Sequence, residues 1–250
     1  MKKILCKILV PILGITMILS TSSISSATST DVTMIDAGTV LAPEKLTRKE
    51  EASYFKIFKI TKKSDVYKRI NGKSYKKNPY IKLSQLRYLK FVHYNYDHEL
   101  QLGEMIVNKK IAKNAITILK KMMRSGYEIK SAFLIDNYWS KGGAQAADKA
   151  SCEAGNTTSF CYRKTVKGSK ISKHATGMAI DLNPIENPYL SKKNGKWFCS
   201  YKNGKPYVNR KKHRDHMISH KDKAFKLFKK YGFKWGGDWH SVKDYQHFEK

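Results

Sequence analysis

Two stretches of the chain repeat apolar residues at helical spacing. Between Asn108 and Gly126, apolar residues recur every three or four positions and lysines occupy the opposite face. This pattern predicts an amphipathic helix with Asn108 as its N-cap and Gly126 at its end. The same pattern in residues 222–232, DKAFKLFKKYG, predicts a second helix that ends at Gly232. Each helix has one apolar face and therefore needs a core to pack against.

Other stretches have the alternation or the turn signals of strands. Residues 85–97, QLRYLKFVHYNYD, mix aromatic and β-branched residues with polar ones and predict a strand, and GEMIV at 103–107 continues the sheet. Residues 129–139, IKSAFLIDNYW, predict a further strand, followed by a Gly-, Ala- and Asn-rich loop to about residue 158. Residues 194–208 contain two Asn-Gly turn signals and predict a hairpin. Because helices and strands intermix without a regular βαβ repeat, we expect an α+β fold.

The first 27 residues have the pattern of a secretory signal peptide. MKK is basic, ILCKILVPILGITMIL is apolar, and the small residues Ser25 and Ala27 suit cleavage after Ala27. A membrane anchor is the alternative, but Lys7 and Pro11 interrupt an apolar stretch that is already short for a bilayer span. We therefore expect a protein that is secreted or held at the cell wall. Residues 28–50 lack periodicity and predict a linker, which leaves residues 51–250 as one domain.

The chain is strongly basic, with 49 Lys and Arg against 20 Asp and Glu and a formal net charge of +29. Cleavage after Ala27 removes three lysines and no acids, which lowers the charge to +26. Outside a cell this charge fits anionic cell-wall polymers, membrane surfaces or nucleic acid, and it also fits a solvated lysine-rich surface without a partner. The sequence lacks the ordered basic and aromatic pattern of a nucleic-acid module, so we expect no specific nucleic-acid partner. It does not indicate an oligomeric state.

Three cysteines follow the predicted cleavage site: Cys152, Cys161 and Cys199. Export permits disulfides. A Cys152–Cys161 disulfide would close a polar loop. The alternatives are that all three are free or that Cys199 takes part in a pair.

Residues 172–181, SKHATGMAID, place a histidine and an acid around a run of small and apolar residues. In a strand that begins at Gly177, alternation puts Gly177, Ala179 and Asp181 on one face and three apolar residues on the core face. The small residues leave space beside Asp181, and His174 lies just before the strand. The pair predicts two ligands of one metal ion. The alternative is a loop histidine and a surface acid.

A third ligand has to come from another part of the chain. Among the other histidines, His247 differs because it follows an acid, Asp244, by three residues and lies between aromatic residues. Two histidines and one carboxylate leave a fourth position open, which is typical of catalytic zinc. A nearby acid that does not bind the ion can take a proton from water.

These motifs resemble those of zinc D-alanyl-D-alanine carboxypeptidases and related peptidoglycan endopeptidases. SKHATGMAID matches the signature S-x-H-x-x-G-x-A-x-D, and DYQH matches the later acid-x-x-His. GNTTSFCYR, LNPIENPY and WGGDW are similar to the surroundings in one branch of the family, and GEMIVN and YFKIFKI to its N-terminal half, so the resemblance covers roughly residues 51–250. It implies a small, mainly antiparallel sheet flanked by helices, as in the Hedgehog/DD-peptidase fold.

The resemblance also implies a ligand set and a base. It predicts Zn²⁺ bound by His174, Asp181 and His247, with Asp244 as general base where some members have glutamate. Ser172 would hydrogen-bond the terminal carboxylate of the substrate or the loop near it.

Two further residues are assigned to the substrate. The family's arginine stabilises the oxyanion or grips the carboxylate, but the matching stretch SAFLIDNYW has none. Arg163 is the substitute, since its planar fork suits either group, and the alternative is a surface basic residue. Trp239, together with Trp235, would wall the substrate groove, or both would close the core.

The implied reaction is hydrolysis of a peptide bond in the peptidoglycan stem peptide, with the D-alanyl-D-alanine bond as the first expectation. An L-Ala–D-Glu endopeptidase and a non-catalytic cationic wall-binding protein are the alternatives. A serine peptidase is disfavoured, because S-x-x-K at 53–56 and 74–77 is expected by chance and the S-D-N and K-T-G motifs are absent. Non-haem iron sites also use two histidines and a carboxylate, but they usually place a His and the acid one residue apart.

Overall fold

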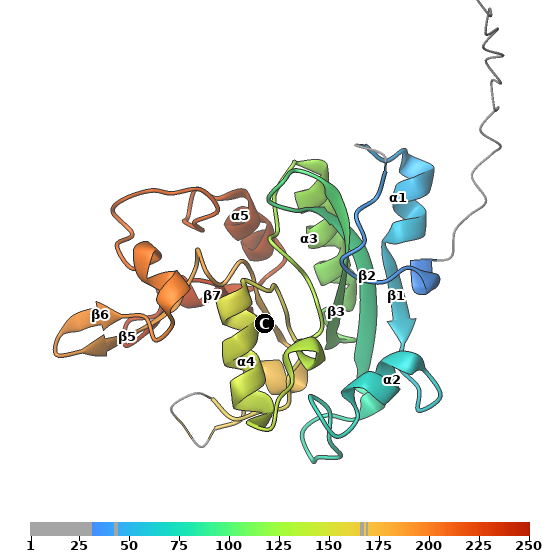
Figure 1. Cartoon of the computed structure of the whole chain (residues 1–250), viewed down its shortest axis with the longest axis horizontal. Coiled ribbons are helices and arrows are strands. Elements are labelled where there is room, and N and C mark those ends of the chain that lie inside the picture. Colours follow the sequence, from blue (N-terminus) through green and yellow to red (C-terminus); the bar gives the residue numbers. More distant parts are fainter. Residues whose placement is uncertain (1–31, 43–44, 166–167, 169) are drawn as a thin grey trace, which may run out of the picture. The chain divides into compact units, whose positions relative to one another are not determined.

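The computed structural model describes residues 32–42, 45–165, 168 and 170–250, and Figure 1 shows their arrangement. The predicted signal peptide and its cleavage site lie outside these residues. Within the described part, no helix is both long enough and apolar enough to cross a bilayer. The α+β prediction is confirmed. The helices are α1 Arg48–Tyr54, α2 Asp65–Ile70, α3 Ala112–Arg124, α4 Gly143–Ala154 and α5 Lys223–Lys230.

Three small antiparallel sheets make up the β part of the described chain. The first has the order β1-β2-β3, the second β4-β9-β7 and the third β6-β5-β8. The strands are β1 Lys56–Lys59, β2 Leu86–Tyr94, β3 Leu100–Asn108, β4 Ala179–Asp181, β5 Tyr189–Lys193, β6 Lys196–Phe198, β7 Lys234–Trp235, β8 Lys243–Asp244 and β9 His247–Glu249. The predicted strands at 85–97 and 103–107 are therefore both present, as β2 and β3.

One core holds the first two sheets and two helices together. Helix α3 lies against β2 and β3 (Figure 1), and its apolar face is buried with theirs. Helix α5 joins the same core through Ala224 and Phe228, and the Phe228 ring stacks on Phe248 of β9 with ring centroids 4.2 Å apart. Both amphipathic helices predicted from the sequence are thus confirmed. The core fixes β9 in place, and β9 carries His247.

The start of α3 differs from its prediction. The helix begins at Ala112, and Asn108 is the last residue of β3 rather than the N-cap. Its side chain organises the turn instead: Oδ1 accepts from Lys110 N at 3.0 Å, and Nδ2 donates to Thr176 O at 2.9 Å. The Asn108 N–H also donates to Gly177 O at 2.8 Å. Asn108 therefore ties the end of β3 to the loop that carries His174.

Residues 129–139 do not form the predicted strand. They contain an isolated bridge at Ser131 and a 3₁₀ helix, Ile135–Tyr138. Leu134 and Ile135 enter two different apolar clusters, and Asp136 accepts hydrogen bonds from Ser74 N and Oγ at 3.1 and 2.6 Å. The 3₁₀ helix, which includes Asp136, replaces the extended backbone that a strand needs, so the apolar residues here are buried without forming a sheet.

The loop predicted after residue 139 contains helix α4, which is a second correction. The helix ends at Gly155, whose φ of 78° is in the left-handed region that suits a helix end. Its buried residues are Ala147 and Ser151, so it packs through small side chains. Of the two Asn-Gly signals, Asn194-Gly195 turns the β5–β6 hairpin with φ of 49° and 75°, whereas Asn203-Gly204 lies in a 3₁₀ helix.

Part of the predicted linker hydrogen-bonds to the first sheet. Gly38 N donates to Leu102 O and Leu41 N to Leu100 O, both at 2.7 Å, and Leu102 N donates to Thr39 O at 2.9 Å. The predicted domain boundaries stay a prediction. Cys152, Cys161 and Cys199 are free thiols, so the described residues contain no disulfide.

Gly177 gives a stability prediction. It has φ of +64°, and a Cβ there would lie 2.7 Å from Asn108 N and 3.0 Å from Val107 C. Gly195 has φ of +75° with no atom near the position of a Cβ. We expect Gly195→Ala to cost about 1–2 kcal/mol of unfolding free energy from the backbone conformation alone. Gly177→Ala should cost more, because it adds a clash with backbone. Urea denaturation of both variants measures the difference, and equal losses would contradict the close approach at Gly177.

Candidate metal centre

His174 and Asp181 reach one site because a short turn precedes a short strand. Ser172 is the N-cap of the 3₁₀ helix Lys173–Thr176, and its Oγ accepts from His174 N at 3.2 Å. The turn leads through Gly177 into β4, which ends at Asp181. The strand begins at Ala179 and not at Gly177 as predicted, because Gly177 ends the 3₁₀ helix with a left-handed φ of 64°. The predicted alternation holds from there on, since Ile180 and Leu182 lie in the main core and Asp181 faces away from it.

The third predicted ligand lies on the neighbouring strand. β4 pairs with β9 in an antiparallel register that places Asp181 directly opposite His247. Side chains at opposite positions of an antiparallel pair are neighbours on the same face of the sheet. The register of two short strands therefore brings together residues that are far apart in the sequence.

Three side chains converge at this site, the two histidines through one ring nitrogen each and Asp181 through both carboxylate oxygens. His174 Nε2 lies 3.1 Å from Asp181 Oδ2, His247 Nδ1 lies 3.1 Å from Asp181 Oδ1, and the two nitrogens lie 3.1 Å from each other. All three side chains are buried, with residue exposures of 4%, 3% and 5% for His174, Asp181 and His247. The alternative of a loop histidine and a surface acid is excluded by this geometry.

One donor atom from each of these side chains can bind the same metal ion, because the donor atoms lie within 4.8 Å of one another. In tetrahedral zinc with bonds of 2.0–2.1 Å, ligand atoms lie about 3.3 Å apart, close to the separations at this site. The donor set of two imidazole nitrogens and one carboxylate oxygen also suits zinc. The residues His174, Asp181 and His247 can therefore hold a metal ion together.

Each ligand has a second hydrogen-bond partner. His174 Nδ1 lies 2.6 Å from Ser159 O, and His247 Nε2 lies 3.2 Å from Glu249 Oε2. Gln246 Nε2 donates to Asp181 Oδ2 at 3.3 Å. Partners of this kind orient metal-binding side chains and raise the basicity of the histidines.

The charges of the ligands are coupled. Burial raises the pKa of Asp181, but the neighbouring His174 and His247 outweigh it and hold the pKa well below its usual value. Burial lowers the pKa of His247, but hydrogen bonds to Asp181 and Glu249 outweigh it and raise the pKa to about 10. Because metal binding needs a neutral imidazole, His247 would have to lose a proton to act as a ligand.

Asp244 lies beside the ligands without being one of the converging three. Its Oδ2 is 4.0 Å from His247 Nδ1, and its side chain is 13% exposed. Burial, together with the negative charge of Asp181, raises the pKa of Asp244 to about 7, although His247 and Arg163 act to lower it. A carboxyl group with this pKa can both accept and release a proton near neutral pH.

Unpaired polar atoms concentrate around this site. Among the described residues, five buried side-chain polar atoms have no hydrogen-bond partner, and three of them belong to Arg163 (Nε), Asp244 (Oδ1) and Gln246 (Oε1). Buried polar atoms are normally paired, so a group of unpaired ones indicates a place where a ligand completes the hydrogen bonds.

Arg163 is not the surface residue of the alternative reading. Its side chain is 7% exposed, and Nη2 donates to Asp148 Oδ1 at 2.8 Å. Its positive charge acts on the pKa of Asp244. The guanidinium is therefore buried near the site, and its Nε–H has no hydrogen-bond partner among the described residues.

Trp235 and Trp239 lie in different environments. Trp235 is buried in the main core and donates from Nε1 to Tyr245 O at 2.7 Å. Trp239 is half-buried, and its ring centroid lies 5.2 Å from that of His247. Gly236 passes close to the site, because a Cβ there would lie 2.6 Å from Asp244 O. Of the two tryptophans, Trp239 is the one whose ring lies beside a predicted metal ligand.

Sequence reasoning missed the residues that support the ligands: Ser159, Gln246 and Glu249. Glu249 follows His247 by two positions, so strand alternation alone would have put both on one face. Ser159 acts through its backbone carbonyl, for which the sequence has no signal.

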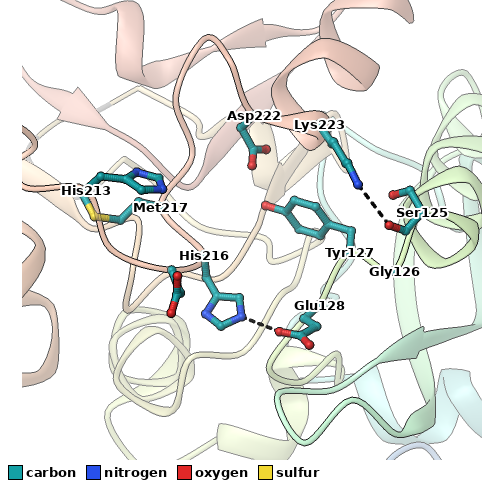
Figure 2. Close-up of a pocket in the computed structure, with 10 residues that line it drawn as sticks. Ser125, Gly126, Tyr127, Glu128, His213, His216, Met217, Asp222 and Lys223 are labelled. Carbon is teal, nitrogen blue, oxygen red and sulfur yellow. Dashed lines mark hydrogen bonds and ion pairs between the residues drawn. The ribbon is translucent and has the colours of Figure 1, made fainter.

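A separate cavity lies away from the predicted metal ligands. It has a volume of about 360 Å³ and is lined by Tyr127, Glu128, His216 and Asp222, among others, and by none of the metal-site residues. Figure 2 shows this cavity, with the His216 Nε2–Glu128 Oε2 pair at 2.7 Å on one side and Lys223 hydrogen-bonded to Ser125 O on the other. It has no part in the chemistry of the metal centre.

Comparison with known proteins gives one match. Residues 165–250 match the family model described as D-alanyl-D-alanine carboxypeptidase. This segment contains all three converging residues and Asp244, and the match indicates a peptidase. No curated protein and no solved structure matches the chain. The resemblance predicted for residues 51–164 stays a prediction.

Proposed function

We propose that the protein is a secreted zinc peptidase, on the premise that residues 165–250 match the D-alanyl-D-alanine carboxypeptidase family model. Its substrate would be the stem peptide of peptidoglycan, and the bond cleaved would be the D-alanyl-D-alanine bond. The observation that carries the proposal is the convergence of His174, Asp181 and His247 at 3.1 Å beside a buried acid. Export and contact with anionic wall polymers are parts of the same proposal, supported by the leader sequence and the charge of +29.

The ligands have the composition of a catalytic rather than a structural zinc site. Three protein ligands leave a fourth position for water or substrate. A zinc ion bound there supplies Lewis-acid polarisation of the scissile carbonyl and acidifies water.

Asp244 would act as the general base and then as the general acid. Its Oδ1 has no partner, so it is free to accept a proton from the attacking water and to pass it to the leaving amine. With a pKa of about 7, Asp244 can both accept and donate a proton near neutral pH. Because the Asp244 side chain is only 13% exposed, solvent does little to weaken its electrostatic interactions.

Two side chains would bind the substrate around the reacting bond. Arg163 would donate from Nε to the developing oxyanion or to the terminal carboxylate, since its Nη2 is already held by Asp148. Trp239 would form a wall beside His247. Ser172 supports this region through its cap on His174 N, and its predicted contact with the substrate would be additional.

Purified muropeptides test the reaction directly. We expect the zinc-loaded protein to release D-alanine from stem peptides that end in D-Ala-D-Ala, with the products identified by mass spectrometry. A chelator should abolish the release and added zinc should restore it, whereas restoration by ferrous iron alone would point to another metal. Cleavage between L-Ala and D-Glu would assign the endopeptidase activity instead. A folded, zinc-loaded protein that binds wall material but gives no product would support the non-catalytic alternative.

A further inference from the structure

His247 contacts a different acceptor with each of its ring nitrogens. Nδ1 faces Asp181 Oδ1 and His174 Nε2, both at 3.1 Å, whereas Nε2 faces Glu249 Oε2 at 3.2 Å. His174 has the opposite arrangement, with Nε2 toward the site and Nδ1 on Ser159 O. The two histidines therefore present different nitrogens to the same point, and a specific contact has to select the nitrogen of each.

Glu249 is placed by strand register to make this selection. His247 and Glu249 lie on one face of β9, two positions apart. The residue opposite Glu249 on β4 is Ala179, which is buried and has almost no side chain. On the other side, β7 places Lys234 opposite Glu249, but the carboxylate lies along its own strand, with Oε2 3.2 Å from His247 Nε2. Among the described residues, its one ion pair is with His247.

From these contacts we propose that Glu249 is a positioning residue, which holds His247 with Nδ1 toward the metal by accepting a hydrogen bond from Nε2–H. This inference rests on the proposed function, because it assumes that a metal ion binds at the site. Without the carboxylate, the imidazole is free to turn about its χ2 angle and present either nitrogen. Only some of these ring orientations would present Nδ1 to the site, so the affinity of the site for metal would fall.

The two histidines differ in how their orientation is secured. His174 is held by a backbone carbonyl, which no side-chain substitution removes. His247 depends on a side chain whose exposure is 23%, so its support can be tested by mutation. Loss of an outer partner of this kind typically weakens metal affinity by about 10–100-fold.

The test measures zinc affinity by competition with a chromophoric chelator in the full chain. We expect Glu249→Ala to bind zinc about 10–100-fold more weakly than wild type. Glu249→Gln keeps a hydrogen-bond acceptor but lacks the negative charge, so its zinc affinity should fall by less than that of Glu249→Ala. The matched control is Glu128→Ala, which also removes a glutamate bonded to histidine, with a side-chain exposure of 24%, but away from the metal ligands. Its zinc affinity should equal that of wild type.

Nitrogen-15 NMR of the histidine rings gives a readout that a purely structural role would not change. In the zinc-bound wild type, His247 should be ligated through Nδ1 and protonated at Nε2. In Glu249→Ala this signature should be lost or mixed with its opposite.

Three results would overturn the inference: wild-type zinc affinity in a folded Glu249→Ala protein, equal losses in Glu249→Ala and Glu128→Ala, or ligation through Nε2 in wild type. The last result needs no variant, so the inference stays testable if Glu249→Ala does not fold. If wild type itself binds no zinc, the proposed function fails, which is a separate outcome.

Discussion

Replacing Asp244 with asparagine is expected to lower hydrolysis of the stem peptide by about 10²–10⁴-fold, the usual contribution of general acid–base catalysis. The amide is the same size but cannot take a proton from water at neutral pH. Zinc should still bind, because Asp244 Oδ2 is 4.0 Å from His247 Nδ1 and is not one of the three converging atoms. Single-turnover rates on muropeptides, with zinc content measured on the same samples, check both parts.

The control for Asp244 is an acid in the neighbouring turn. Asp238 pairs with His220 at 2.7 Å, and its side chain is 43% exposed. Asp238→Asn should leave the rate unchanged. An Asp244→Asn protein that cleaves at the normal rate would remove Asp244 from the reaction and leave the base unidentified.

Replacing either histidine ligand with alanine is expected to abolish zinc binding and hydrolysis together. His174→Ala and His247→Ala each remove one of three protein ligands, and each leaves the carboxylate of Asp181 buried with one partner fewer. An unpaired buried group costs about 1–3 kcal/mol, so both variants should also unfold at lower denaturant concentration. Metal analysis, muropeptide digestion and urea denaturation give the three measurements.

His98→Ala is the control for the ligand variants. His98 also contacts a carboxylate, Glu128, at 3.0 Å, but its side chain is 63% exposed and it lies outside the converging group. It should keep full zinc content and activity. If either ligand variant retained stoichiometric zinc, the assignment of that histidine would be wrong.

The parts of the fold with sustained patterns could be predicted from the sequence. Helices α3 and α5 were predicted because each buries one continuous apolar face in the same core. Helix α4 was missed because it packs through Ala147 and Ser151, which give no apolar stripe. The strand at 129–139 was wrongly predicted because a run of apolar residues does not distinguish a strand from other buried backbone, and here the chain turns into a 3₁₀ helix whose Asp136 bonds to Ser74.

The convergence of His174, Asp181 and His247 was predicted more completely than its surroundings. His174, Asp181 and His247 are chemically distinctive and lie in recognisable motifs, so the sequence identified them before their convergence was known. Gln246 and Glu249 acquire their places from the pairing of β4 with β9, and that pairing is a tertiary feature. The burial of Arg163 was equally invisible, because it depends on Asp148 of α4, a helix that the sequence did not predict.

Asn108 affects whether the matched segment, residues 165–250, can keep its structure apart from the rest of the chain. Residues 165–250 carry every converging residue, yet the turn before β4 is braced from outside that segment, by the Asn108 side chain on Thr176 and its N–H on Gly177. The carbonyl that steadies His174 comes from Ser159, also outside it. If residues 165–250 were expressed alone or transferred to another protein, they would lose the hydrogen bonds to Asn108 and to Ser159. Any transfer of the matched segment to another protein therefore has to include Asn108 and Ser159 and the residues that hold them in place.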